Sequence, residues 1–212
     1  MKVIKLYEEF TNKTLNINNS EYGLYFDGYK DDEDESKVVM WMTEGSQEAN
    51  FSMVSKYIKS GNSVLDYGCG VGGFVKHLES KGIIVSDYLG VDINEKFIDT
   101  ATEKHKEYKF KHITDSDELS DKWDDVVVIG VFTWYIERDE FIRTINKLYD
   151  IANNQLLITC NLGNFEDNKY FWKKEYRFYN EKIFLKLFPD YNITFDYDKN
   201  NNNTTLLVKI IK

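Results

Sequence analysis

The sequence predicts an α/β fold, a three-layer sandwich in which helices cover both faces of a mostly parallel sheet. Two observations support this prediction. Between residues 63 and 161, short apolar segments alternate with stretches of helical periodicity, which is the order of strands and crossover helices in a parallel sheet. After residue 190, two strand-like segments flank a run of asparagines, which predicts a C-terminal hairpin.

We interpret the chain as a single domain over residues 46–212, preceded by an N-terminal extension or lid over residues 1–45. Apolar side chains at helical spacing in residues 1–10 predict a short amphipathic helix at the start of this extension. The acidic run 31–35 lacks the alternating acids and the glycine turn of a calcium loop. We therefore interpret it as a solvated segment and predict no metal site.

Cap residues and glycines delimit the predicted helices. Ser46 is suited to cap a helix that ends near Gly61, ahead of the first strand. Gly82 is a typical stop signal for the helix after that strand. Asn94 and Asn180 are suited to cap two later helices, the second of which is short.

The predicted strands differ in their side-chain patterns. Residues 108–113 alternate aromatic or apolar with charged side chains, which indicates a strand near the sheet edge. Residues 125–132 form a continuous apolar run, as is typical of a parallel strand covered on both faces. An amphipathic helix over 137–152 separates this strand from the next. In chain order, the predicted strands are 63–67, 88–92, 108–113, 125–132, 155–161, 191–197 and 205–211.

Composition narrows the class of protein. The formal net charge of -9 argues against a broad nucleic-acid-binding face, because such faces use Lys and Arg to neutralise phosphates. Only Cys69 and Cys160 could form a disulfide, and Cys69 lies in a glycine-rich turn, so a reducing compartment fits better. Neither a membrane-spanning apolar run nor a signal-peptide core is evident, so we expect a cytoplasmic protein.

A glycine-rich turn after the first strand is the main functional signal. Gly68, Gly70 and Gly73 fit the dinucleotide fingerprint G-x-G-x-x-G. Together with Asp66, the glycines at 68, 70 and 72 also fit D-x-G-x-G-x-G, the first motif of S-adenosylmethionine (SAM)-dependent methyltransferases. A third interpretation is a strand-to-helix turn that uses glycine for geometry alone.

The charge of Asp66 favours SAM over a dinucleotide. A carboxylate two residues before the first glycine would repel the pyrophosphate that a dinucleotide brings to this turn. SAM instead brings an ammonium, a carboxylate and a sulfonium. The carboxylate of Asp66 can then meet the ammonium, and the N-terminus of the following helix can meet the carboxylate.

With these motifs in this order, the chain resembles the class I SAM-dependent methyltransferases from about Gln47 to its C-terminus. Residues 66–72 match the first motif, residues 90–93 match the acidic end of the second strand, and residues 125–132 match the fourth strand. Members of this family have a seven-stranded sheet whose last strand inserts antiparallel, which suits the predicted hairpin. The resemblance implies SAM as cofactor and S-adenosylhomocysteine (SAH) as its product.

The resemblance also implies roles for individual residues. Asp92 would accept hydrogen bonds from both ribose hydroxyls, and Ile93 would pack on the adenine. Asp115 matches a position that often contacts the adenine amino group. Its surroundings depart from the usual Gly-Asp, so Asp117 and a purely turn-forming role for Asp115 are alternatives. The predicted cofactor-binding residues are Asp66, Gly68, Cys69, Gly70, Gly72, Asp92, Ile93, Asp115, Gly130 and Phe132.

The methyl acceptor is expected beyond the carboxyl ends of the strands, at the switch between the first and fourth strands. Core or lid packing is the alternative role for the aromatic candidates among its contacts. Because positioning alone can lower the barrier to methyl transfer greatly, we assign no catalytic acid or base. His77, His105 and His112 are expected to be surface or packing residues away from this edge. The candidate acceptor contacts are Trp41, Gln47, Trp134, Tyr135, Asn161 and Tyr176.

The exit from the fourth strand helps to exclude acceptor classes. It lacks the [Asn/Asp/Ser]-Pro-Pro-aromatic turn of methyltransferases that act on adenine, cytosine or glutamine amino groups. Cys160 lacks the Pro-Cys context needed for cytosine C5 methylation. These exclusions and the acidic charge predict a methyltransferase that acts on oxygen or nitrogen of a small molecule. A methyltransferase of protein or RNA and a non-catalytic SAM-binding protein are the alternatives.

Overall fold

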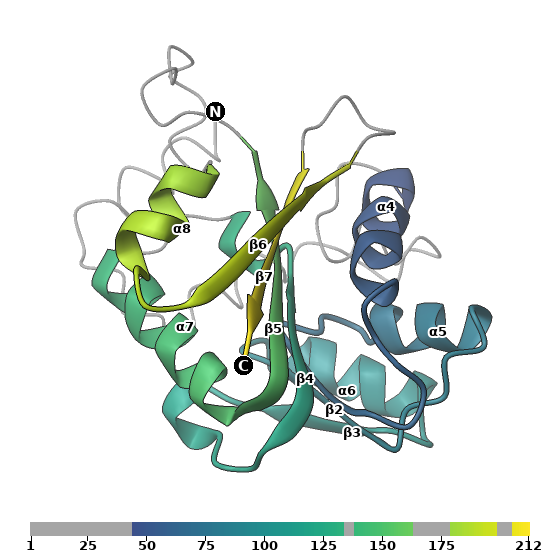
Figure 1. Ribbon diagram of the computed structural model, residues 1–212. Coiled ribbons are helices and arrows are strands. Elements are labelled where there is room, and N and C mark those ends of the chain that lie inside the picture. Colours follow the sequence, from purple (N-terminus) through teal and green to yellow (C-terminus); the bar gives the residue numbers. More distant parts are fainter. Residues whose placement is uncertain (1–43, 134–137, 163–178, 199–204) are drawn as a thin grey trace, which may run out of the picture.

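The computed structural model describes residues 44–133, 138–162, 179–198 and 205–212 (Figure 1). The predicted N-terminal helix and the acidic run 31–35 lie outside these residues. In chain order, the elements are α4 (Glu44–Ser55), β1 (Ser63–Tyr67), α5 (Gly73–Ser80), β2 (Asp87–Asp92), α6 (Glu95–Lys104), β3 (Lys109–His112), η1 (Ser116–Glu118), β4 (Trp123–Ile129), η2 (Val131–Thr133), α7 (Arg138–Ile151), β5 (Ala152–Asn161), α8 (Glu181–Leu187), β6 (Asn192–Tyr197) and β7 (Thr205–Ile211).

The strands form one seven-stranded sheet in the order β3-β2-β1-β4-β5-β7-β6. Strands β1 to β5 are parallel to one another, and β7 inserts antiparallel between β5 and β6. This arrangement confirms the predicted sheet and the C-terminal hairpin. Because β1 pairs with both β2 and β4, the order of the strands reverses at β1, and the glycine-rich turn leaves the sheet at this point.

Two hydrophobic layers cover the two faces of the sheet. Successive residues of a strand point to opposite faces, so Val64 packs in the layer beneath α4 and α5, whereas Leu65 packs in the layer beneath α7 and α8. Val127 and Val128 of β4 divide in the same way. Figure 1 shows α4, α5 and α6 on one side of the sheet and α7 and α8 on the other. The three-layer prediction is therefore confirmed.

Most of the predicted caps are confirmed. The side chain of Asn94 accepts a hydrogen bond from the backbone of Lys96 at the start of α6, and the side chain of Asn180 accepts one from Ile183 at the start of α8. Gly82 follows α5 with a φ of 69°. Within the described ranges, no helix combines the length and apolar character needed to cross a bilayer.

Two predicted boundaries were wrong. Helix α4 begins at Glu44, so Ser46 lies inside its first turn and is not the N-cap; the helix then ends at Ser55, well before Gly61. Strand β4 ends at Ile129, because Gly130 adopts a φ of 76° and the chain then turns into η2. An apolar run that continued past Gly130 concealed this end of the strand.

A buried carboxylate ties the amino-terminal edge of the sheet together. Asp125 of β4 accepts hydrogen bonds from the side-chain amides of Asn62 (2.8 Å) and Gln155 (2.9 Å). The amide of Gln155 also donates to the carbonyl oxygen of Tyr57 at 2.9 Å. Burial raises the pKa of Asp125, and the two amides oppose that rise. The network joins β1, β4 and β5 to the segment that follows α4.

We expect Asp125→Ala to lower the free energy of unfolding by about 1–2 kcal/mol, because two amide donors lose their acceptor. Urea unfolding measures this change. Asp87→Ala is the matched control, since Asp87 pairs with Lys109 at the protein surface, where an ion pair contributes little. Equal losses from the two substitutions would contradict a stabilising role for the buried network.

Candidate functional site

The glycine-rich turn connects β1 to α5 at the carboxyl edge of the sheet. Gly68, Gly70 and Gly72 have φ values of 79°, 55° and 85°, which side chains other than glycine rarely adopt. The backbone N–H groups of Gly68 and Cys69 both donate to the carbonyl oxygen of Val91, at 2.7 and 3.0 Å. The turn is therefore fixed against the end of β2.

Gly72 is the N-cap of α5 and supplies no side-chain hydrogen bond to the first N–H groups of the helix. A helix N-terminus in this state favours an anionic group, because its N–H groups and dipole point outward. The burial of Cys69 raises the pKa of its thiol well above the usual value, so the thiol is neutral in the turn. The sequence-based prediction of an anion-binding helix start thus has a matching geometry.

Close packing explains why Gly68 has no side chain. A Cβ atom at Gly68 would lie 2.2 Å from Cγ2 of Val131 in η2. Gly61 has a similar φ of 91° but open space around it.

We expect Gly68→Ala to lower the free energy of unfolding by about 1–2 kcal/mol more than Gly61→Ala, because only the former adds a clash to the strained φ. Thermal unfolding of both variants tests this, and equal losses would contradict it.

Asp92 ends β2 beside the turn and holds two backbone segments. One carboxylate oxygen accepts from the N–H of Gly70 and the other from the N–H of Asn94, both at 2.9 Å. The backbone of Ile93 also contacts this carboxylate. A carboxylate has about four lone-pair sites, so Asp92 can still accept a hydrogen bond from a ribose hydroxyl. Burial raises the pKa of Asp92, and the backbone donors oppose this rise.

Asp66 lies deeper than the sequence suggested. It is 1% exposed, and its carboxylate accepts a hydrogen bond from the hydroxyl of Tyr88 at 2.6 Å. Burial raises the pKa of Asp66 to about 7, the Tyr88 hydrogen bond opposes the rise, and the charge of Asp92 adds to it. A cation beside this pair of carboxylates would relieve their repulsion. The charge distribution therefore fits a ligand with a positive group. Because the Asp66 carboxylate is buried, it would act on that group through its charge and not by direct contact.

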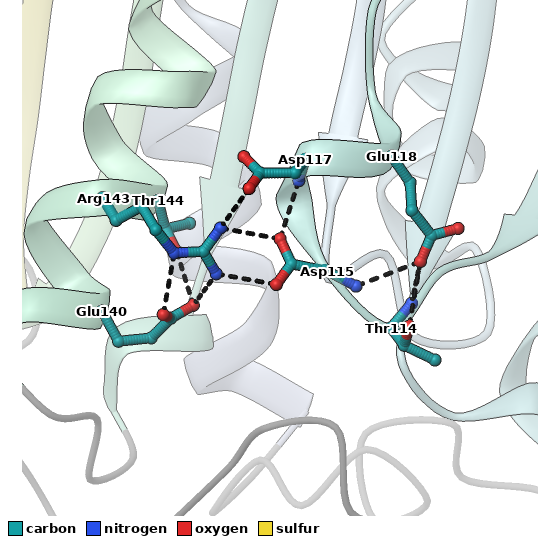
Figure 2. A network of polar contacts seen from close by, with 7 residues as sticks. All are labelled: Thr114, Asp115, Asp117, Glu118, Glu140, Arg143 and Thr144. Atoms are coloured by element: carbon teal, nitrogen blue, oxygen red, sulfur yellow. Dashed lines mark hydrogen bonds and ion pairs between the residues drawn. The ribbon is translucent and has the colours of Figure 1, made fainter.

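Asp115, the predicted adenine contact, forms an ion pair in the structure (Figure 2). Its two oxygens face the guanidinium of Arg143 from α7, with both N–O distances at 2.8 Å. It also caps η1 by accepting from the N–H of Asp117 at 2.8 Å. Arg143 lowers the pKa of Asp115 through these hydrogen bonds. Asp115 thus has the turn-forming role that is the alternative to an adenine contact. The adenine contact stays a prediction.

Figure 2 shows that Asp117 and Glu140 also face the guanidinium of Arg143. Arg143 contacts Asp117 at 2.9 Å and Glu140 at 2.6 Å. Burial raises the pKa of Tyr67 at the end of β1, and the carboxylates of Glu140, Asp115 and Asp92 add to this rise. Sequence reasoning did not single out Tyr67 or Arg143, because their importance depends on contacts between distant segments.

The structure describes two of the six candidate acceptor contacts. The side-chain Nε2 of Gln47 lies near the turn, 3.6 Å from the position that a Cβ of Gly73 would occupy. Asn161 ends β5 at the carboxyl edge of the sheet, opposite Thr205 of β7. The other four candidates lie outside the described residues, and they are Trp41, Trp134, Tyr135 and Tyr176.

Two further predictions concern residues at this edge. The side chain of Phe132 is 1% exposed and packs on Phe141, with ring centroids 4.9 Å apart, so only its backbone is available to a ligand. His112 is the last residue of β3, and its Nε2 lies 3.0 Å from the carbonyl oxygen of Ile93. The expectation that all three histidines lie away from the open edge was therefore wrong for His112. It was also wrong for His105, whose Cδ2 lies 2.6 Å from the position that a Cβ of Gly72 would occupy in the turn.

Comparison with known proteins agrees with this geometry. Residues 45–190 match the model of a family described as "Methyltransferase domain". No protein of curated function matches the sequence significantly. Among solved structures, the complex of DhpI with SAM and HEP has a TM-score of 0.70 at 12% identity and covers 94% of this chain and 100% of the other.

Two other solved structures are similar. Magnesium protoporphyrin IX methyltransferase (ChlM) from Synechocystis PCC 6803 with bound SAH has a TM-score of 0.66 at 17% identity, over 92% of this chain and 96% of the other. A putative methyltransferase in complex with the Trm112 methyltransferase activator of Haloferax volcanii has a TM-score of 0.63 at 14% identity, over 79% and 91%. At these identities the likeness concerns the fold.

The family match spans most of the chain, and the fold and the strand order agree with it. The chain therefore belongs to the methyltransferase-domain family and has the fold of the class I SAM-dependent methyltransferases.

Proposed function

We propose that this protein transfers a methyl group from SAM to an oxygen or nitrogen atom of a small molecule. The observation that carries the cofactor assignment is the turn at residues 68–72, held by Asp92 and followed by an uncapped helix start. SAM supplies a methyl group already activated by a sulfonium. The residues around the turn then have to bind the cofactor, orient it and exclude water.

Each part of the turn suits one part of the cofactor. In this proposal the first N–H groups of α5 bind the cofactor carboxylate, and Asp66 attracts its ammonium. Asp92 accepts from the ribose hydroxyls, and Ile93 packs against the adenine. The open lone pairs of the Asp92 carboxylate and the repulsion between Asp66 and Asp92 support these roles.

The acceptor is expected beside Asn161 and Gln47, near the carboxyl ends of β1, β4 and β5. The net charge of -9 supports a small-molecule acceptor. The similarity to ChlM, whose name gives a porphyrin as its substrate, also supports it. The Trm112 complex favours a second candidate, in which the methyltransferase requires an activator protein as its partner.

Methyl incorporation from labelled SAM into a cell extract, separated afterwards into small-molecule, protein and RNA fractions, tests the proposal. We expect a small acceptor to gain the label while SAH accumulates, and Asp92→Ala to abolish both signals. Label that appears only in protein or RNA would instead indicate a methyltransferase that acts on macromolecules. Bound SAM without turnover in any fraction would instead indicate a non-catalytic protein.

A further inference from the structure

A chain of polar contacts joins α4 to α5 on the outer side of the turn. Nε2 of His77 lies 3.1 Å from the hydroxyl of Ser55, and Nδ1 of His77 lies 3.0 Å from a carboxylate oxygen of Glu48. Lys81 adds an ion pair with Glu48 at 3.4 Å. Glu48 and Ser55 belong to α4, and His77 and Lys81 belong to α5 or its cap. The imidazole therefore links two turns of α4 to α5.

The order Glu48, His77 and Ser55 matches the acid, base and nucleophile of a serine hydrolase triad. The surroundings of these residues do not suit hydrolysis. Ser55 is 6% exposed and His77 is 5% exposed, so the hydroxyl is closed to a substrate. The imidazole packs against two phenylalanines, 5.7 Å from the ring centroid of Phe51 and 6.3 Å from that of Phe74. These contacts indicate that Glu48, Ser55, His77 and Lys81 hold α4 against α5. We call this group of residues the clamp.

The clamp lies next to the residue of α4 that reaches the turn. Gln47 precedes Glu48, and its Nε2 approaches Gly73, the first residue of α5. Phe51, one helical turn later, also packs against Gly73, at 3.3 Å from the position of a Cβ. The distance of the Gln47 amide from the start of α5 therefore depends on how closely α4 is held to α5. Glu48 and His77 set this spacing at the end of α4 that carries Gln47.

We propose that Gln47 donates a hydrogen bond to the carboxylate of the bound cofactor, and that Glu48 and His77 are positioning residues that hold Gln47 there. The amide of Gln47 would add a donor to the N–H groups of α5, which Gly72 leaves without a side-chain cap. This inference rests on the proposed binding of SAM at the turn. It assigns recognition of the methionine end of the cofactor to α4.

Binding of two ligands separates positioning from general stability. SAH carries the carboxylate that Gln47 would bind, and adenosine lacks the whole methionine end. We expect Gln47→Ala to weaken SAH binding by about tenfold, the effect of one hydrogen bond to a charged group. Glu48→Ala and His77→Ala should weaken it less, and all three variants should bind adenosine as the wild type does. Equilibrium dialysis measures each affinity.

A double-mutant cycle tests whether the clamp acts through Gln47. The variant with both Gln47→Ala and His77→Ala should bind SAH no more weakly than Gln47→Ala alone, because the clamp has nothing left to position. Glu48→Gln keeps an acceptor for His77 and should restore most of the affinity that Glu48→Ala loses. Glu48→Ala is also the variant least disruptive to folding, since the side chain is 53% exposed.

Gln155→Ala is the control for lost stability. It breaks the hydrogen bonds to the carbonyl oxygen of Tyr57, beyond the other end of α4, and to Asp125, and should leave SAH affinity unchanged. Additive losses in the cycle, or equal losses for SAH and adenosine, would overturn the positioning role. Failure of the folded wild type to bind SAH at all would overturn the proposed function itself, so the two failures are distinguishable.

Discussion

Replacing Asp92 by Ala is expected to weaken SAM binding by about a hundredfold. A hydrogen bond to a carboxylate contributes about 1.5–3 kcal/mol, and two ribose hydroxyls would lose their common acceptor. The substitution also frees the N–H groups of Gly70 and Asn94, so the turn itself loosens. Competition binding against labelled SAH measures the loss.

Asp87→Ala is the matched control for Asp92→Ala, because Asp87 lies at the opposite end of the same strand and pairs with Lys109 at the surface. Its affinity for SAM should equal that of the wild type. Removal of the ribose 2′-hydroxyl from the ligand should weaken binding to the wild type but hardly change binding to Asp92→Ala. Unchanged affinity of Asp92→Ala for SAM would refute the ribose role.

SAM binding is expected to weaken by about tenfold between pH 7.5 and pH 6, because protons compete with the cofactor ammonium for Asp66. Burial raises the pKa of Asp66 to about 7 in the free protein, so the carboxyl takes up a proton over this range. An ammonium beside the carboxylate would lower that pKa again, so binding would release a proton. Titration calorimetry in buffers of different ionisation heat measures both the affinity and the released proton.

The same carboxyl predicts the opposite trend for stability without cofactor. Because the pKa of Asp66 is raised from the model-peptide value of 3.8 to about 7, the folded protein binds more protons than the unfolded chain between these values. The contribution of Asp66 to stability is therefore present at low pH and is lost as the pH rises to about 7. Urea unfolding of the cofactor-free protein across this range measures it.

Asp66→Asn separates the charge of Asp66 from its shape. The amide oxygen can still accept from Tyr88, but it neither titrates nor attracts an ammonium strongly. We expect this variant to bind SAM about tenfold more weakly at pH 7.5, because the attraction between the buried charge and the ammonium is lost. Its affinity should also be independent of pH over this range. A pH dependence that persists in Asp66→Asn would place the ammonium elsewhere.

The sequence predicted the features that depend on local chemistry. Glycine at 68, 70 and 72 signalled the turn because no other residue suits its φ values, and Asn94 and Asn180 signalled helix starts through their cap side chains. Apolar runs predicted the strands, and the run of asparagines marked the final hairpin. The predicted start of α4 was wrong because Ser46, inside the helix, is also a suitable N-cap. The predicted end of β4 was wrong because the apolar run continues past Gly130.

Contacts between distant segments were beyond sequence reasoning. Tyr88 meets Asp66 because β1 and β2 pair in one particular register, which the apolar pattern alone does not specify. Arg143 meets Asp115 across 28 positions of sequence, and His77 meets Glu48 across 29. The charge of Asp66 could therefore be read from the sequence, but its burial could not.

Titration of the wild-type protein with SAM and then SAH tests the account most directly. The turn at residues 68–72 should bind one SAM per chain, and SAH should displace it, while Asp92→Ala should show little heat at the same concentrations. Absence of heat with either ligand, from protein shown to be folded by its cooperative unfolding, would contradict the assignment of this turn as the SAM site.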